Sequence, residues 1–522
     1  MEAFDMSHHP VTFQSTLAEL YPPLAGSPVA ELAVTGMCSD SRAVQPGWLF
    51  VAMPGLSTDG RDYIDQAVRN GAAAVFAQAQ DGFAMHLDGA VPVVDVPALQ
   101  ALVSQLAARF YQSPGDALDL VAVTGTNGKT SCSQMIAAVA SRLGLAAGVV
   151  GSLGYGRSGT ALAETGLTTP EAVQMQRCLA ELLADDCQLV ATEVSSHALV
   201  QFRVAAVPFR TAVFTCLSRD HLDYHETMTA YADAKRQLFY FDSLERAVIN
   251  IDDEFGRELY AELAGRVSRL SYSLHDQAAD FWLSGISYSL SGIEATLHHG
   301  EECAALSLQL IGQFNLANAL AVAATLVGPG VTLAAVADAL SRQQPIAGRM
   351  QMLCAPATRE AAVSADITRL QQSDITVVID YAHTPDALAQ ALSALQPHSQ
   401  ARLHCLFGCG GDRDRGKRAL MGRAAAALAD SLVVTSDNPR SEPPQQIIDD
   451  ILLGIDDPSD VYIEADRKTA IEQLIGTAGA GDIVLVAGKG HENYQEIAGR
   501  KLPFSDHAIA LQALDQRRGV NP

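Results

Sequence analysis

A glycine-rich segment, Gly125-Thr-Asn-Gly-Lys-Thr130, has the residue types and the setting that phosphate binding requires. It follows the apolar run LDLVAVT and precedes the helical pattern SCSQMIAAVASRLG, so we expect a strand, a turn and a helix in that order. Backbone N–H groups and the helix N-terminus would surround the phosphates, Lys129 would neutralise the β and γ oxygens, and the Thr130 hydroxyl would reach Mg²⁺. The loop alone indicates nucleotide binding and no particular reaction, and an ordinary strand–helix turn is the alternative.

Two further candidate residues stand at the ends of apolar runs. Glu193 ends the run LVATE, and His221 follows the run TAVFTCL. Neighbouring strands of a phosphate-loop sheet present their carboxyl-terminal residues near the ligand, so Glu193 could bind Mg²⁺ directly and His221 could complete a second cation site. Each also has a structural alternative, because a glutamate at a strand end is usually solvated and a histidine can cap a turn.

The elements that must position these residues alternate between strands and helices, which predicts an α/β protein with parallel sheets. Segment 1–114 combines short apolar strands with a helix at 97–111 and ends near the linker SPGD. Segment 115–346 contains the phosphate loop, and an alternating pattern at 280–312 predicts antiparallel strands. Segment 347–522 contains five apolar runs followed by polar, glycine-rich residues, which indicates a second nucleotide- or substrate-binding sheet. We therefore expect three domains.

The composition limits the possible classes of protein. With 522 residues, 48% hydrophobic and 18% charged, the chain can form several globular cores. Its formal net charge of −24 argues against a general nucleic-acid binder. No apolar run reaches the roughly 18 residues of a membrane span, and the N-terminus lacks signal-peptide features. The nine cysteines are scattered without a CxxC pair, so we expect reduced thiols in a cytosolic enzyme.

The order of the motifs resembles that of the Mur ligase family. The motifs are GTNGKT, TEVSSHALVQFR, LSRDHLDYH, YADAKRQLF, GQFNLANAL, GRM, DYAHTPDAL, FGCGGDRDRGKR, DNPR and GKGHE, and the resemblance runs from SDSR at 39 to residue 495. It is closest to the branch that adds meso-diaminopimelate to UDP-N-acetylmuramoyl-L-alanyl-D-glutamate. The resemblance implies an N-terminal UDP-binding domain, a central ATPase and a C-terminal Rossmann-like domain that binds the amino acid.

It also implies the reaction and its setting. ATP would phosphorylate the D-glutamate γ-carboxylate, and the incoming amine would attack the acyl phosphate to give an amide, ADP and phosphate. Mg²⁺ would be the cofactor and ATP a co-substrate. The enzyme would act in peptidoglycan precursor synthesis in the bacterial cytoplasm, and thus in cell-wall biogenesis, cell shape, cell division and the cell cycle. We expect a monomer with no nucleic-acid partner.

Residue roles follow from the same resemblance. ATP would contact Gly125, Thr126, Asn127, Gly128, Lys129, Thr130, Ser131, Asn315, Asn318, Arg349 and Asp380. The UDP-muramoyl dipeptide would contact Ser39, Ser41, Leu56, Ser57, Thr58, Thr168, Thr169, Ser195, Gln201 and Arg203, of which Leu56 to Thr58 fit a variable loop. Diaminopimelate would contact Arg413, Asp437, Asn438, Pro439, Arg440, Gly488 and Glu492.

The resemblance implies that the catalytic residues are Lys129, Glu193, His221 and Lys235. Lys235 matches a lysine that is carbamylated in the family. With Thr130, Glu193 and His221 it would bind the metal. An ammonium group would repel Mg²⁺, whereas a carbamate supplies two anionic oxygens.

Arg440 is the residue that bears on which amino acid is added. Diaminopimelate differs from lysine by a second carboxylate, which a guanidinium can hold with two parallel hydrogen bonds. Lysine would leave that charged donor unpaired, and selectivity of this kind reaches roughly 10⁴–10⁵. Glu492 would receive the distal ammonium. The structural alternative is that Arg440 caps its own loop.

Three other functions remain open from the sequence. A lysine-adding Mur ligase is disfavoured by the argument from Arg440. A folylpolyglutamate synthase shares the ATPase motif, but SDSR and DNPR do not suit it. A nucleotide-dependent switch would need no acceptor site in the third domain, and its ATP turnover would not depend on two acceptor substrates.

Overall fold

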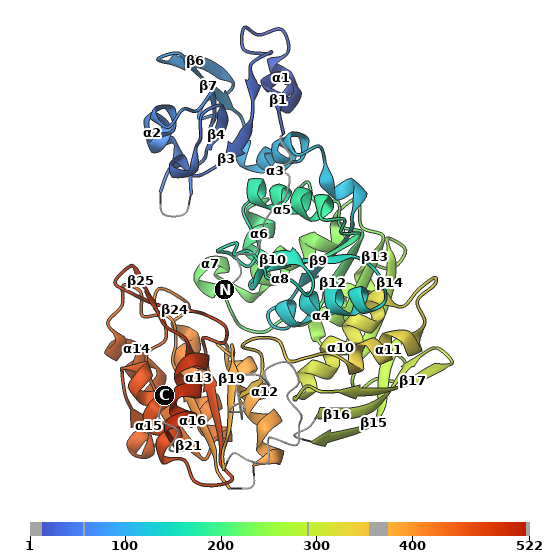
Figure 1. Cartoon of the computed structure of the whole chain (residues 1–522), viewed down its shortest axis with the longest axis vertical. Coiled ribbons are helices and arrows are strands. Elements are labelled where there is room, and N and C mark those ends of the chain that lie inside the picture. The colour runs from blue at the N-terminus through green and yellow to red at the C-terminus, as the bar shows by residue number, and fades with distance from the viewer. Residues whose placement is uncertain (1–12, 56–57, 290–291, 354–373, 400, 518–522) are drawn as a thin grey trace, which may run out of the picture. The chain divides into compact units, whose positions relative to one another are not determined.

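The structure is a computed structural model, and it describes residues 13–55, 58–289, 292–353, 374–399 and 401–517 (Figure 1). The chain divides into two compact units. Unit 1 comprises Met1–Thr124, Ala140–Val213 and Ala234–Ala247, and unit 2 comprises Gly125–Val139, Phe214–Asp233 and Val248–Pro522. Within the described residues, no helix is both long enough and apolar enough to span a membrane.

The N-terminal part of unit 1 is a five-stranded sheet. Its strands, in spatial order, are β3 (Gly36–Cys38), β4 (Trp48–Ala52), β5 (Ala74–Gln78), β7 (Val91–Val96) and β6 (Ala84–Asp88). All neighbours are parallel except β6, which pairs antiparallel with β7 at the edge. The outer elements are α1 (Leu17–Leu20), α2 (Ile64–Arg69), α3 (Leu99–Phe110) and a small pair, β1 (Ser15–Thr16) with β2 (Ala33–Val34). The expected helix at 97–111 is therefore confirmed as α3.

The second part of unit 1 holds the strands that precede the candidate site residues. Its strands are hydrogen-bonded in the order β10 (Gly154–Arg157), β9 (Ala147–Gly151), β11 (Leu189–Glu193) and β8 (Asp119–Thr124). β11 runs parallel to both β8 and β9, so the carboxyl ends of these three strands lie at one edge. Helices α5 (Ala172–Ala184) and α6 (Ser196–Val200) and strand β12 (Thr211–Phe214) complete this part.

The first part of unit 2 begins with the phosphate loop and contains the expected antiparallel strands. Its helices are α7 (Leu222–His225), α9 (Glu254–Glu262), α10 (Gln313–Leu326) and α11 (Leu333–Ser341), together with the larger part of α4 (Lys129–Arg142) and of α8 (Met228–Arg236). Its strands are the larger part of β13 (Arg246–Asn250), β14 (Ser268–Ser273), β15 (Phe281–Ser289), β16 (Gly292–His299) and β17 (Glu302–Leu308). β15, β16 and β17 pair antiparallel, which confirms the alternating pattern at 280–312.

The C-terminal part of unit 2 is a second α/β sheet. Its strand order is β18 (Gln351–Leu353), β19 (Thr376–Asp380), β23 (Ile483–Ala487), β20 (Leu403–Phe407), β21 (Ser431–Val434) and β22 (Tyr462–Ile463). Only β18 is antiparallel to its neighbour. The last long strand, β23, is inserted between β19 and β20. Because β19, β23, β20 and β21 run parallel, the loops that follow them all emerge at one edge of the sheet.

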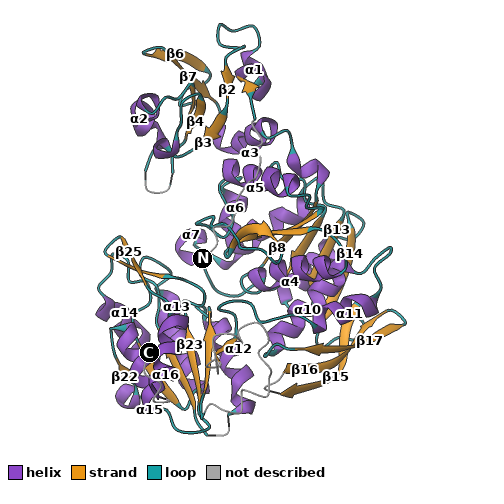
Figure 2. Cartoon of the chain, viewed as in Figure 1, coloured by secondary structure: helices purple, strands orange, loops and turns teal. Residues whose placement is uncertain are grey.

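Two helical layers cover this sheet, as Figure 2 shows. One face packs against α12 (Pro385–Leu395), α13 (Gly416–Leu428) and α14 (Pro444–Leu452). The other face packs against α15 (Arg467–Thr477) and α16 (Asp506–Arg517). Because strand residues alternate between faces, Val378 and Leu485 belong to the first core and Val377 and Val484 to the second. A hairpin of β24 (Tyr494–Ile497) and β25 (Arg500–Pro503) follows the GKGHE motif.

Candidate functional site

The phosphate loop has the predicted strand–turn–helix setting. It follows β8, which ends at Thr124, and α4 begins at Lys129. Gly125 and Gly128 have φ angles of +149° and +85°. A Cβ atom on Gly125 would lie 1.8 Å from the Thr215 hydroxyl oxygen, and one on Gly128 would lie 2.8 Å from Asn318 Oδ1. Both the backbone conformation and the available space therefore require glycine.

Side chains from the segment after β12 hold this loop in place. Thr126 Oγ1 accepts a hydrogen bond from the Ser218 N–H at 2.9 Å and lies 3.2 Å from the Tyr231 hydroxyl. The Thr215 hydroxyl donates to the Asn127 carbonyl at 2.6 Å. Lys129 Nζ donates to the carbonyls of Gly125 and Thr126 at 2.9 and 2.8 Å. A phosphate bound here would therefore compete with loop carbonyls for the ammonium group.

Residues far along the chain reach the start of α4. Arg349 Nη2 donates to Thr130 Oγ1 at 3.0 Å, and its guanidinium lies 4.3 Å from the centroid of the Tyr381 ring. Asn318 Oδ1 accepts from the Cys132 thiol at 3.3 Å, and its Nδ2 donates to Asn315 Oδ1 at 3.3 Å. Two of the residues predicted to surround ATP, Asn318 and Arg349, thus contact the helix that carries Thr130 and Ser131, and Asn315 holds Asn318.

Asp380, predicted to contact ATP, also holds the backbone around it. At the end of β19 its carboxylate accepts hydrogen bonds from the N–H groups of Met350 and Ala382, both at 2.7 Å. Burial raises the pKa of Asp380, while the charge of Arg349 and the two N–H donors oppose that rise. The carboxylate therefore fixes the backbone directly after Arg349.

A buried aspartate, Asp220, organises the histidines near the loop. Lys417 Nζ donates to Asp220 Oδ1 at 3.0 Å, and Nε2 of His221 and Nε2 of His383 lie 3.4 and 3.5 Å from Oδ2. Burial opposes ionisation of Asp220, but the hydrogen bond from His383 and the charges around it hold its pKa well below the usual range. Sequence reasoning missed Asp220 and Lys417. The one sequence feature that pointed to Asp220 is its position directly before the candidate His221.

Glu193 lies in unit 1 at the end of β11 and is fully buried. Its Oε1 accepts from the Ser152 N–H at 2.8 Å, and its Oε2 lies 3.2 Å from Ser152 Oγ. Ser152 Oγ in turn lies 3.0 Å from Thr168 Oγ1. Glu193 is therefore not a solvated strand-end glutamate, and Ser152, which the sequence analysis missed, holds its carboxylate.

The residues predicted to contact the dipeptide form one network with this strand. The Thr169 hydroxyl donates to the Glu193 carbonyl at 2.8 Å and lies 3.3 Å from Ser195 Oγ. Arg203 donates from Nη1 to the Thr169 carbonyl at 2.8 Å and from Nη2 to Gln201 Oε1 at 2.6 Å. The structure thus brings together Thr168, Thr169, Ser195, Gln201 and Arg203.

Lys235 lies near the end of α8 and is only 1% exposed. A buried ammonium needs compensation by neighbouring polar groups or a change of its charge state. Burial therefore disfavours the alternative of a surface lysine, and carbamylation stays a prediction.

A cavity of about 970 Å³ in unit 1 is lined by residues of its N-terminal part and by residues of segment 167–177. Ser39, Ser41 and Thr58 line it, whereas Leu56 and Ser57 lie outside the described residues. The Ser39 hydroxyl donates to Glu171 Oε2 at 2.6 Å, and the Ser41 hydroxyl to Gln66 Oε1 at 2.8 Å. This volume is at the upper end of the range for small-molecule sites.

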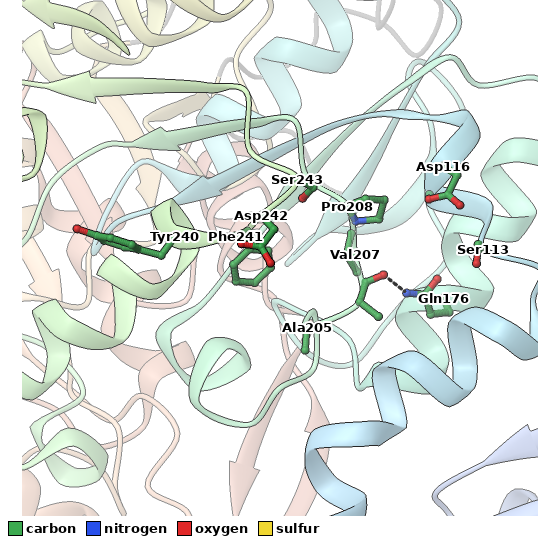
Figure 3. Close-up of a pocket in the computed structure, with 12 residues that line it drawn as sticks. Ser113, Asp116, Gln176, Ala205, Val207, Pro208, Tyr240, Phe241, Asp242 and Ser243 are labelled. Carbon is green, nitrogen blue, oxygen red and sulfur yellow. Dashed lines mark hydrogen bonds between the residues drawn. The ribbon is translucent and has the colours of Figure 1, made fainter. Parts of the chain in front are cut away.

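A second cavity in unit 1, of about 390 Å³, contains none of the predicted site residues (Figure 3). Asp116, Gln176, Tyr240 and Asp242 are among the residues that line it, and the Gln176 amide donates to the Ala206 carbonyl at 3.2 Å. The two carboxylates are exposed to solvent.

The residues predicted to bind the amino acid lie at the carboxyl ends of β20, β21 and β23. Lys489 is fully buried, and its Nζ donates to Asn438 Oδ1 at 3.0 Å and to Glu492 Oε2 at 2.7 Å. The Asn438 amide also donates to Glu492 Oε2, at 2.8 Å. Burial raises the pKa of Asp437. Burial acts on Glu492 in the same direction, but the charge and hydrogen bond of Lys489 outweigh it and hold the pKa of Glu492 low.

Arg440 adopts a left-handed conformation with φ of +52°. Its N–H donates to the Glu496 carbonyl at 3.0 Å, which attaches the DNPR loop to the β24–β25 hairpin. Its Nη1 donates to the Gly411 carbonyl at 2.7 Å, and its Nε lies 3.3 Å from Glu496 Oε2. These contacts connect the DNPR loop to the loop that carries Arg413. Arg440 therefore bridges three segments instead of capping only its own loop.

Comparison with known proteins assigns the family. Three family models match consecutive parts of the chain: the Mur ligase family catalytic domain at 33–111, the Mur ligase middle domain at 123–326 and the Mur ligase glutamate ligase domain at 365–490. This chain belongs to the Mur ligase family.

Similar Mur ligases match it over nearly their full length. One from Pseudomonas putida, named UDP-N-acetylmuramoyl-L-alanyl-D-glutamate–2,6-diaminopimelate ligase, is 47% identical over 91% of this chain and 94% of its own. One of the same name from Xanthomonas campestris is 44% identical over 97% of this chain and 98% of its own. A solved structure of that name is 34% identical, with a TM-score of 0.65, and covers 97% of this chain and 99% of its own.

Proposed function

We propose that this Mur ligase joins meso-diaminopimelate to the D-glutamate γ-carboxylate of UDP-N-acetylmuramoyl-L-alanyl-D-glutamate, with ATP as co-substrate. The names of relatives that are 44–47% identical over nearly the whole chain support the reaction. One structural observation carries the choice of amino acid. Arg440 and Glu492 lie on loops at one edge of the C-terminal sheet. Arg440 is a cation that suits the second carboxylate of diaminopimelate, and Glu492 is an anion that suits its distal ammonium.

The first step transfers a phosphoryl group. An oxygen of the D-glutamate γ-carboxylate attacks the γ-phosphorus of ATP, the bond to the β-phosphate oxygen breaks, and ADP leaves. Lys129 would leave the carbonyls of Gly125 and Thr126 to bind the phosphate oxygens. Arg349, which now donates to the Thr130 hydroxyl, supplies a second positive charge at the start of α4. Fixed charges of this kind stabilise the charge that develops in the transition state.

The types of donor that we assign to the metal suit Mg²⁺. The Thr130 hydroxyl and the Glu193 carboxylate are hard oxygen ligands, and Ser152 already holds Glu193 in one orientation. Mg²⁺ commonly binds through one or two carboxylates plus substrate phosphates, so a larger protein cluster is not needed. Among the described residues, no group of three or more His, Cys, Asp or Glu side chains forms such a cluster. When bound, the ion would neutralise phosphate oxygens.

Lys235 as a carbamate and His221 complete our assignment of the metal-binding residues. The carbamate would replace a buried positive group with an anion that can bind a cation, which removes the electrostatic repulsion. His221 is positioned by Asp220, which also receives Lys417 and His383. Labelled CO₂ and carbon NMR on the purified protein would test for the carbamate directly.

The second step forms the amide. The neutral amine of diaminopimelate attacks the acyl-phosphate carbon, phosphate leaves, and the amine loses a proton. The acceptor loops would hold the amino acid by its distal end, with the Arg440 guanidinium on the carboxylate and Glu492 on the ammonium. The product would serve peptidoglycan synthesis in the bacterial cytoplasm, and through it cell-wall biogenesis, cell shape, cell division and the cell cycle.

The test is phosphate release from ATP with Mg²⁺ and UDP-N-acetylmuramoyl-L-Ala-D-Glu, with meso-diaminopimelate or L-lysine as the acceptor. We expect release with diaminopimelate and a product whose mass equals the dipeptide substrate plus the amino acid minus water. Equal or better use of lysine would replace the proposal with a lysine-adding ligase. Release that needs neither dipeptide nor amino acid would indicate a nucleotide-dependent switch.

A further inference from the structure

A buried ion pair lies in the C-terminal part of unit 2, beneath the two acceptor loops. The side chains of Arg467 and Asp506 are both fully buried. Arg467 donates from Nε to Asp506 Oδ1 at 2.8 Å and from Nη2 to Oδ2 at 2.7 Å, so the pair is bidentate. Arg467 is the first residue of α15 and Asp506 is the first residue of α16. The pair therefore joins the ends of both helices that cover one face of the sheet.

The same guanidinium also holds two strand ends. Arg467 Nη2 donates to the Ala487 carbonyl at 2.8 Å, and Nη1 to the Ser436 carbonyl at 3.4 Å. Ala487 directly precedes Gly488, and Ser436 directly precedes Asp437. Each carbonyl is thus the last backbone acceptor before a loop predicted to bind diaminopimelate.

The sheet itself does not join these two strands. β20 lies between β21 and β23, so no ladder hydrogen bond connects the strand before Asp437 to the strand before Gly488. On the ligand side, the loops are linked by Lys489 and Glu492 through Asn438. On the opposite side, Arg467 supplies a link by holding both carbonyls at once. The spacing of the two loops thus depends on Arg467 in the core as well as on the polar link through Asn438.

Stability alone is a weak explanation for this arrangement. A fully buried ion pair must overcome the desolvation of both charges, and replacing such a pair with apolar residues is often neutral or stabilising. Arg467 also places a positive charge beneath the acidic residues Asp437 and Glu492.

We propose that Arg467, held by Asp506, is a positioning residue that fixes the spacing of the Asp437–Arg440 and Gly488–Glu492 loops and thereby the affinity and selectivity for the amino acid. The inference rests on the proposed function, because it assigns these loops to diaminopimelate. Arg467 would act through the two carbonyls and would not touch the substrate.

The variants are Arg467→Lys, which keeps the charge and loses the planar fork, and Asp506→Asn, which keeps the shape and loses the charge. Arg517→Lys is the matched control. Arg517 ends α16, pairs with Asp374 at 2.5 Å and donates to the Ile475 carbonyl at 2.9 Å. It also pairs an arginine with an aspartate and with backbone carbonyls, in a more exposed setting about 16 Å along the helix from Asp506 and away from the loops.

Steady-state KM and kcat for each of the three substrates are the measurement, with circular dichroism as a check on folding. A displacement of about 1 Å can cost up to about 100-fold. We therefore expect Asp506→Asn to raise the KM for meso-diaminopimelate by about tenfold to about 100-fold. The KM values for ATP and the UDP-dipeptide should stay within about twofold. Arg467→Lys should give a smaller rise, and Arg517→Lys none.

Three results would overturn the proposal. An equal change in all three KM values would assign the pair to stability alone, and so would unfolding of both variants. The third is an unchanged KM for diaminopimelate in folded variants. Wild-type enzyme that does not use diaminopimelate would instead refute the proposed function, and the wild-type control distinguishes that case.

Discussion

Removal of the Arg440 guanidinium tests the basis of amino-acid selection. The side chain is 20% exposed, and its Nη1 is hydrogen-bonded to the Gly411 carbonyl at 2.7 Å. Within the part of the chain that the structure describes, Nη2 makes no hydrogen bond. Nη2 and the second hydrogen of Nη1 thus remain as the two donors for a substrate carboxylate. Arg440→Ala removes both and keeps a Cβ atom, so the strain of the left-handed backbone is unchanged.

The magnitude follows from the number of lost bonds. A hydrogen bond to a charged group contributes about 1.5–3 kcal/mol. Two such bonds in a partly exposed site, where solvent screens the charge, should contribute about 2–4 kcal/mol in total. Each 1.36 kcal/mol corresponds to a factor of ten, so kcat/KM for meso-diaminopimelate should fall by about 30-fold to about 900-fold. L-Lysine lacks the second carboxylate, so its kcat/KM should change by less than about threefold.

The assay is the ratio of kcat/KM values for the two amino acids, measured for wild type, Arg440→Ala and Arg440→Lys. Lysine at this position keeps a charge but not the fork, so we expect an intermediate loss. Arg415→Ala is the control, because Arg415 is exposed and pairs with Asp450 at 3.0 Å. The reasoning is refuted if Arg440→Ala loses both amino acids equally, or if diaminopimelate turnover falls by less than about threefold.

Three further predictions follow from the other contacts. Lys129→Ala should lower kcat/KM for ATP by at least about 100-fold, and a loss below tenfold in phosphate release would contradict the role given to this lysine. Ser152→Ala removes the hydroxyl that lies 3.2 Å from Glu193 Oε2 but keeps the backbone N–H bond to Oε1, so it should raise the Mg²⁺ concentration for half-maximal activity by up to roughly tenfold; an unchanged Mg²⁺ titration would contradict the support that this hydroxyl is predicted to give Glu193. The hydrogen bonds from Arg418 lower the pKa of Glu442 to about 2 from 4.5. The contribution of Glu442 to the free energy of unfolding is therefore complete above about pH 4.5 and is lost as the pH falls toward 2. Glu442→Gln should therefore lower the free energy of unfolding by about 1–2 kcal/mol at pH 7, and a difference in urea unfolding that does not shrink by about pH 3 would contradict this.

The sequence could predict the features that depend on local pattern. The parallel strands are continuous apolar runs, because both faces of the sheet are covered by helices, and the candidate residues follow those runs directly. That is why Glu193, Asp437 and Gly488 could be located at strand ends before any contact was known. The glycines of the phosphate loop could be located in the same way, because they directly follow an apolar run. The structure shows why glycine is needed there, since a Cβ atom on Gly125 would lie 1.8 Å from the Thr215 hydroxyl oxygen.

The features that escaped prediction depend on contacts between distant segments. Asp220 and Lys417 are 197 positions apart, and nothing in either local pattern indicates that they pair. Lys489 was visible within GKGHE, but its full burial between Asn438 and Glu492 depends on the insertion of β23 between β19 and β20. Strand order is a tertiary property, so a residue whose role depends on it has no local signal.

Burial also distinguishes three cations in the region predicted to bind the amino acid. Arg413 is exposed and donates to the Asp412 carbonyl at 3.2 Å, so solvent screens its charge and it discriminates poorly between similar ligands. Lys489 is fully buried, but its charge is already neutralised by the ion pair with Glu492. Arg440 alone of the three is both largely buried and left with hydrogen-bond donors at Nη2 within the described structure. Diaminopimelate and lysine share the same two amino groups, so the choice between them must depend on a cation of this kind, and we expect Arg440 to account for most of it.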